Sequence, residues 1–130
     1  MQPVSEITHG IKVSVIPKYH HETSKPSLGR YIHSYDIAIE NLSGLEVQLL
    51  RRHWIITDGF GNSRVIKGDG VIGQQPILGP DDVHYYTSWS PMTTPVGKMK
   101  GFYTMRRTAD NSFFEVEIPE FPLIAELKLN

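Results

Sequence analysis

The chain has 130 residues and no cysteine, with 13 basic against 14 acidic side chains. Its length is that of one domain around one hydrophobic core, and the missing cysteines exclude disulfides and thiolate sites and favour the cytoplasm. The balanced charge argues against nucleic acid as a partner. Residues 1–10 lack a secretory signal pattern, and no run of roughly eighteen apolar residues predicts membrane insertion.

Apolar residues recur at every second position, which is the period of a strand with one buried and one exposed face. The strand-like segments, in chain order, are 11–15, 35–39, 46–57, 83–89, 99–107 and 114–118. Within 46–57 the apolar phase slips between Leu49 and Leu50, which predicts a β-bulge. Gly101 indicates a second bulge, and we expect Trp54 to fill the core between two sheets.

Turn-forming residues separate these segments at 41–44, 58–62, 80–82 and 110–111. Residues 20–29 are expected to form a mobile loop between the first two strands, and residues 90–97 a long loop stiffened by prolines. No window has a capped helical stripe. We therefore predict one all-β domain over residues 1–130, an immunoglobulin-like or fibronectin-type-III-like β-sandwich of seven to eight antiparallel strands. A small closed barrel is the structural alternative.

The segment Gly68–Gly73 matches the pattern G-x-G-x-x-G of dinucleotide-binding sites. That chemistry needs a helix directly after the glycines, and Pro76 stops a helix at this point. Two interpretations remain open. The glycines shape a loop or bulge for steric reasons, or the backbone amides around Gly68, Gly70 and Gly73 form a nest that binds phosphate without a helix.

Neither a metal site nor a catalytic site is predicted. His20 and His21 are adjacent, but the six histidines have no ligand-like spacing, so weak adventitious binding is the expectation there. No nucleophile motif is present. The paired carboxylates, Asp81–Asp82 and Glu115 with Glu117, fall on a turn and on an exposed strand face, where they favour solubility rather than acid–base chemistry.

Residues 85–91 combine aromatic and hydroxyl side chains at the end of a strand. Alternation places half of the aromatic residues in the core. We expect the other half, represented by Tyr86, to form an exposed recognition surface of the kind that supplies binding hot spots. The basic residues 51–53 and 106–107 are interpreted as solvated strand faces.

Three stretches resemble a known family: residues 47–58 (VQLLRRHWIITD), residues 68–76 (GDGVIGQQP), and residues 86–88 followed by 94–97, Met99 and Gly101. Their order and spacing are similar to those of the ApaG family over nearly the whole chain. The resemblance implies a fibronectin-type-III-like sandwich, a bacterial cytoplasmic protein and a link to cobalt resistance and magnesium efflux. It also implies a protein-interaction role and a pyrophosphate site proposed on Gly68, Gly70 and Gly73. The chain departs from the pattern at Gln74, Asp81 and Trp89.

These observations predict a non-enzymatic binding module with an unidentified protein partner and with no metal or other cofactor. The alternative is binding or sensing of a nucleotide or pyrophosphate, such as a diadenosine polyphosphate, through the glycine-rich loop. A third hypothesis is binding of a divalent cation as part of magnesium or cobalt homeostasis.

Overall fold

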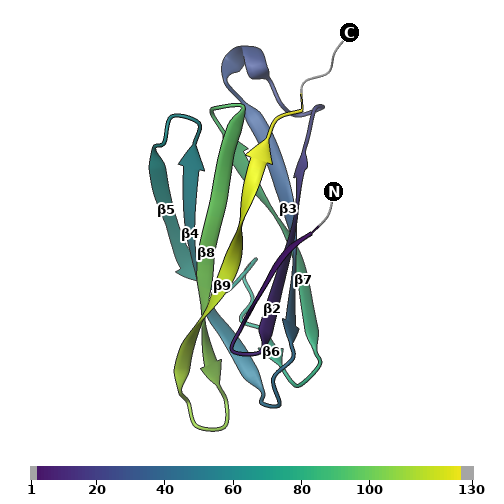
Figure 1. Ribbon diagram of the computed structural model, residues 1–130, viewed down its shortest axis with the longest axis vertical. Coiled ribbons are helices and arrows are strands. Elements are labelled where there is room, and N and C mark those ends of the chain that lie inside the picture. The colour runs from purple at the N-terminus through teal and green to yellow at the C-terminus, as the bar shows by residue number, and fades with distance from the viewer. Residues whose placement is uncertain (1–2, 127–130) are drawn as a thin grey trace.

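The computed structural model describes residues 3–126, which form two antiparallel sheets packed face to face (Figure 1). The first sheet has the order β1 (Val4–Thr8), β2 (Ile11–Tyr19), β3 (Tyr31–Asn41), β7 (Val83–Met92). The second has the order β5 (Ser63–Asp69), β4 (Val47–Asp58), β8 (Val96–Arg107), β9 (Phe113–Ile124), and the short β6 (Ile77–Leu78) also pairs with β4. A short 3-10 helix, Pro26–Leu28, precedes β3.

The predicted all-β sandwich is confirmed, and the barrel alternative is wrong because the two sheets stay separate. The described residues contain nine strands instead of seven or eight. The sequence did not indicate β1 because most of its side chains are exposed, so no apolar alternation marks it. Residues 20–29 consequently connect the second and third strands.

The core consists of the alternate residues of the long strands, as their period predicts. Trp54 is 3% exposed and lies between the sheets. Its ring contacts Tyr35 from the opposite sheet, with centroids 5.3 Å apart, and Phe121 at 6.0 Å. The expectation that Trp54 fills the core is confirmed.

Register shifts occur at both predicted positions, although the extra residue of the second lies on β9 and not on the strand that holds Gly101. The β4–β8 register shifts between Leu49 and Arg51, and the β8–β9 register shifts between Met99 and Gly101. The first bulge changes which side chains of β4 point inward, because an extra residue reverses the alternation beyond it. Leu49 is buried before the bulge, whereas Trp54 and Ile56 are buried after it.

The loop between β7 and β8 is shorter than expected. β7 continues to Met92 and β8 begins at Val96, so the connection comprises residues 93–95 instead of 90–97. Pro91 lies within β7, where an edge strand accommodates a residue without a backbone N–H. The prolines therefore do not indicate the extent of the loop.

Candidate binding site between the edges of β5 and β7

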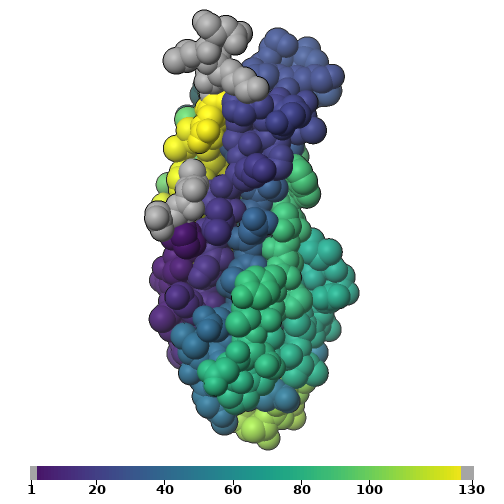
Figure 2. Space-filling model, turned by 90° about the vertical axis from the view of Figure 1, so that its right-hand side faces the viewer, coloured from purple at the N-terminus to yellow at the C-terminus, as the bar shows by residue number. Residues whose placement is uncertain are grey.

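A cavity of about 480 Å³ opens between the sheets where β5 ends one sheet and β7 ends the other. We call it the edge cavity. Its lining includes the core residues Trp54 and Met99, and the exposed side chains of Ile66, Ile72 and Trp89 border it. In Figure 2 the green surface of β7 adjoins the teal surface that β5 and the following loop contribute. The volume lies within the ordinary range of ligand sites.

Arg52 enters the edge cavity from β4. It lies two residues before Trp54, beyond the bulge, and therefore shares the inward phase of that buried tryptophan. Its Nη1 donates hydrogen bonds to the carbonyl oxygens of Asp69 (2.9 Å) and Gly70 (3.0 Å). No carboxylate oxygen of residues 3–126 lies within 4.0 Å of its guanidinium. The charge is thus held by carbonyl groups and is not neutralised.

Gly68 makes room for that guanidinium. A Cβ atom at residue 68 would lie 2.6 Å from Nη2 and 2.8 Å from Cζ of Arg52. Since the clash involves the end of a flexible side chain, alanine at this position is expected to displace Arg52 and leave the fold intact.

Arg64 of β5 also lines the edge cavity, and it lies opposite Ile56 of β4. Its Nη2 donates a hydrogen bond of 3.1 Å to the carbonyl oxygen of Pro91 and so links β5 to β7. Within the described residues this guanidinium also has no carboxylate at ion-pair distance. Asp69 borders the cavity too, but its Oδ1 lies 3.7 Å from Nε of Arg51.

Tyr35 and Tyr86 line the edge cavity, and Tyr103, the hydrogen-bond partner of Tyr86, is fully buried. The hydroxyls of Tyr86 and Tyr103 are hydrogen bonded at 2.5 Å. Burial raises the pKa of Tyr86, an effect that the Tyr103 hydrogen bond and the charge of Arg52 partly offset, and burial also raises the pKa of Tyr103. Burial raises the pKa of Tyr35 as well. These groups stay protonated at neutral pH and act as hydrogen-bond donors rather than as bases.

The backbone of β7 presents hydrogen-bonding groups beside this cavity. Ile32 of β3 lies opposite Pro91 of β7. Its backbone groups are nevertheless bonded elsewhere: the carbonyl accepts from the His20 N–H, and the N–H donates to Ser24 Oγ. Ile32 and Pro91 are therefore a non-hydrogen-bonded pair. The Pro91 carbonyl points away from β3, in agreement with its contact with Arg64.

The β3–β7 register is unbroken, and hydrogen-bonded and non-hydrogen-bonded pairs alternate along an antiparallel ladder. Every second residue of β7 before Pro91 is therefore also in a non-hydrogen-bonded pair. The N–H and C=O groups of Trp89, Thr87 and Tyr85 consequently point away from β3. Within residues 3–126 no strand pairs with this side of β7, and we call it the free edge.

The predicted recognition role of Tyr86 as an exposed aromatic residue is wrong. Tyr86 is largely buried against the core, whereas Tyr85 is 74% exposed and Trp89 is 55% exposed. The alternation has the opposite phase, because Tyr86 shares the inward side with Ser88 and Ser90. The exposed aromatic surface therefore lies on the outer face of β7.

The glycine motif folds without a helix. β5 ends at Asp69, and residues 71–74 form a tight turn in which Val71 and Gln74 exchange backbone hydrogen bonds of 2.8 and 3.0 Å. Ile72 and Gly73 have positive φ angles of 47° and 72°, which are typical of a type I′ turn. The absence of a helix after residue 73 confirms the rejection of a dinucleotide fold.

Steric need explains much of the motif. Gly70 has a φ of +63°, and a Cβ atom there would overlap the Gln74 carbonyl oxygen. Its N–H donates to the Leu50 carbonyl at 2.8 Å. The amides of Gly70, Val71 and Gln74 are thus engaged, and at the turn the predicted phosphate nest is left with Ile72 and Gly73, two residues that line the edge cavity. Phosphate binding there stays a prediction.

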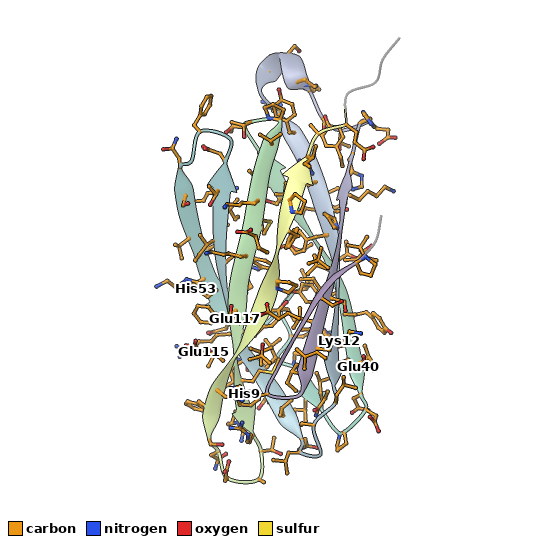
Figure 3. All side chains as sticks on the ribbon, viewed as in Figure 1. His9, Lys12, Glu40, His53, Glu115 and Glu117 are labelled. Carbon is orange, nitrogen blue, oxygen red and sulfur yellow. The ribbon has the colours of Figure 1, made fainter. Side chains whose placement is uncertain are left out.

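The histidines and carboxylates do not converge. His20 Nε2 is 2.7 Å from Ser34 Oγ, whereas His21 lies against the ring of Tyr19 at 4.8 Å. In Figure 3 His9 and His53 lie at separate places on the sandwich, and Glu115 and Glu117 project from β9. In the part of the chain that the structure describes, no group of three His, Asp or Glu side chains is arranged to hold a metal ion.

Sequence reasoning missed Arg52. The basic segment 51–53 predicts a solvated strand face, and the bulge before Arg52 hides the inward phase of this residue. The spacing from Trp54 would have indicated the inward orientation of Arg52, because Arg52, Trp54 and Ile56 occupy every second position of the strand. Arg64 carries no comparable signal, since the strand that holds it is mostly exposed.

The fold and site define a two-sheet antiparallel sandwich with an arginine-lined cavity at one open side. No helix among residues 3–126 has the length and apolarity to cross a membrane. The family model of the ApaG domain matches residues 21–107, and the chain belongs to this family.

Relatives cover most of the chain. Protein ApaG of Methylobacterium sp. strain 4-46 is 47% identical over 89% of this chain and 88% of its own length. Protein ApaG of Paramagnetospirillum magneticum is 44% identical over 92% and 91%. A crystal structure from Bordetella pertussis, described as ApaA, superposes with a TM-score of 0.86 at 42% identity and covers 88% of this chain and 93% of that one.

Proposed function

We propose that this chain is a non-enzymatic protein-binding module that pairs an extended segment of a partner protein with the free edge of β7. The free edge offers the backbone groups of Tyr85, Thr87 and Trp89 directly beside a cavity between the sheets. Strand addition to an exposed edge is a recurring mode of peptide recognition, in which backbone bonds give affinity and pockets for alternate side chains give specificity. This juxtaposition of edge and cavity is the observation that carries the proposal.

The surface next to the free edge supports the same function. Tyr85 and Trp89 are exposed on the outer face of β7, and aromatic side chains of this kind supply much of the binding energy of protein interfaces. The cavity lining contains tyrosine and serine hydroxyls, two arginines and a solvent-exposed aspartate. Such a lining has donors for recognition but no base beside a nucleophile, which favours binding over catalysis.

The family resemblance sets the context of this proposal. We expect the module to act in the cytoplasm, and its link to magnesium and cobalt homeostasis would operate through the bound protein and not through ion transport by the module itself.

Replacement of Thr87 by proline tests the pairing. Proline removes the N–H that points to the free edge and fits the φ of a strand, so the hydrogen bonds to β3 are kept. Thr87→Val is the matched control, because both variants lose the hydrogen bond from Thr87 Oγ1 to Asp36 Oδ1, whereas valine keeps the N–H. A photoreactive residue at Trp89 should cross-link a partner in cell extract, and one at Glu115 on the other sheet should not.

The expected result is that Thr87→Pro abolishes the cross-link and Thr87→Val retains it. Equal cross-linking by both variants, or equal labelling from positions 89 and 115, would contradict the proposal.

Pyrophosphate binding is the second candidate. Its specific support is that Ile72 and Gly73 line the same cavity as Arg52 and Arg64. Titration with inorganic pyrophosphate should then shift the amide NMR signals of residues 72 and 73 at millimolar ligand or below. Unchanged signals at those residues would remove this candidate.

A further inference from the structure

We infer that the edge cavity recognises acidic side chains of the paired segment, at two positions four residues apart with an apolar residue midway between them. This inference deepens the proposed function and rests on it. It names the chemistry of the segment that pairs with β7.

The register of β4 and β5 sets the spacing. Gly68 lies opposite Arg52, Ile66 opposite Trp54, and Arg64 opposite Ile56. Residues 64 and 68 are thus about 14 Å apart along the strand, at about 3.4 Å per residue. The backbone positions that carry the two arginines are therefore four residues apart along the ladder, with Trp54 and Ile66 between them.

β7 runs along the same cavity. Arg64 contacts the carbonyl of Pro91, and Arg52 and Tyr86 both line the cavity. A strand paired with the free edge points its alternate side chains toward this space, and side chains at positions i, i+2 and i+4 span about 14 Å. The pattern acidic–x–apolar–x–acidic therefore fits both ends. It is symmetric, so it fits a parallel and an antiparallel segment alike.

Charge supplies the complementarity. Arg52 and Arg64 donate to carbonyl oxygens, and within residues 3–126 neither has a carboxylate within 4.0 Å. Arginine forms strong, often bidentate hydrogen bonds with a carboxylate. Arg52 is half-buried and Arg64 is exposed, so we expect the Arg52 contact to contribute more of the affinity. Asp69 also lines the cavity, but its carboxylate lies at ion-pair distance from Arg51 on the exposed side of β4.

The probe is a random library of 12-residue peptides displayed on phage and selected on the folded chain. The enriched peptides should share the acidic–x–apolar–x–acidic spacing. For a selected synthetic peptide, fluorescence polarisation should show at least a tenfold loss of affinity for Arg52→Gln, and a similar loss when either acidic residue of the peptide becomes its amide.

Gly68→Ala is a second test of the role of the Arg52 guanidinium. Its methyl group would displace the Arg52 guanidinium without removing it, so we expect a comparable loss of affinity. Lys67→Gln is the matched control. It removes an exposed positive charge on β5 that lies outside the lining of the edge cavity, and affinity should stay within about twofold.

The outcomes separate this inference from the proposed function. Selected peptides that lose binding with Thr87→Pro but not with Arg52→Gln or Gly68→Ala would keep strand addition and overturn the acidic pattern. Peptides that bind Thr87→Pro as well as the parent would overturn the proposed function. Enrichment of no sequence, or only of sequences without paired acidic residues, also counts against the inference.

Discussion

His33 should make the stability of the fold depend on pH. It lies in the inward phase of β3 and is 1% exposed. Its Nε2 has no hydrogen-bond partner among the described residues, and its ring lies 5.2 Å from that of Tyr19. Burial, with a smaller contribution from the charge of His20, lowers the pKa of His33 from 6.5 to about 4.

The direction of the effect follows from proton uptake. Between pH 6.5 and about 4 the unfolded chain binds a proton at His33 that the folded chain does not bind. The free energy of unfolding therefore falls as the pH falls through this window, and it levels off below the folded pKa. With these two pKa values the loss is about 2.5 kcal/mol by pH 4.5, a large share of the stability of a small domain.

The substitution His33→Leu removes this proton linkage and keeps an apolar side chain of similar size in the core. Urea unfolding monitored by tryptophan fluorescence, repeated from pH 8 to pH 4.5, should show a smaller loss of stability in the variant by about 2.5 kcal/mol. His9→Asn is the control, because His9 is exposed and asparagine tolerates its positive φ of 51°. Parallel stability curves for the parent and His33→Leu would refute the reasoning.

Three further substitutions test the packing around the edge cavity by urea unfolding at neutral pH. Gly70→Ala should cost at least about 2 kcal/mol, because it combines strain at positive φ with backbone overlap, whereas Gly61→Ala has open space around it and should cost about 1 kcal/mol. Tyr103→Phe should cost about 1–3 kcal/mol by leaving the Tyr86 hydroxyl without its partner, and the double change of both tyrosines to phenylalanine should recover part of that loss. Arg52→Leu should lower stability by no more than about 1 kcal/mol, since it places an apolar side chain in a core phase. A large destabilisation by this change would show that Arg52 is needed for folding.

The sequence predicts the sandwich because its strands alternate in composition. Ile11, Val13 and Val15 are fully buried, as their spacing indicates. Most apolar runs have one phase, and the one in 46–57 changes phase only at its bulge. Burial of these phases on two sheets leaves few other arrangements. The same logic fails for β7, where aromatic and hydroxyl side chains occupy both faces. Tyr85 and Tyr86 are neighbouring residues of the same type, so the sequence alone does not tell which of them points into the core. The pairing of β7 with β3 decides this.

The edge cavity is not predictable from local pattern. It depends on β5 and β7 becoming the ends of two different sheets, which is a property of strand order and not of any segment. The glycine motif is visible in the sequence, but its role depends on a partner 16 residues earlier, since Gly68 accommodates the side chain of Arg52. A local comparison with phosphate-binding loops cannot reveal that contact.

The placement of Arg52 itself argues for a ligand. A guanidinium in the inward phase of a core strand costs desolvation energy, and a chain selected for stability alone would place an aliphatic residue there or supply a carboxylate partner. This chain instead holds Arg52 by the carbonyls of Asp69 and Gly70 and keeps residue 68 without a side chain. That arrangement orients the charge but leaves it without a counter-ion among the described residues. An external carboxylate would complete the site, because it supplies the negative charge that the fold itself withholds.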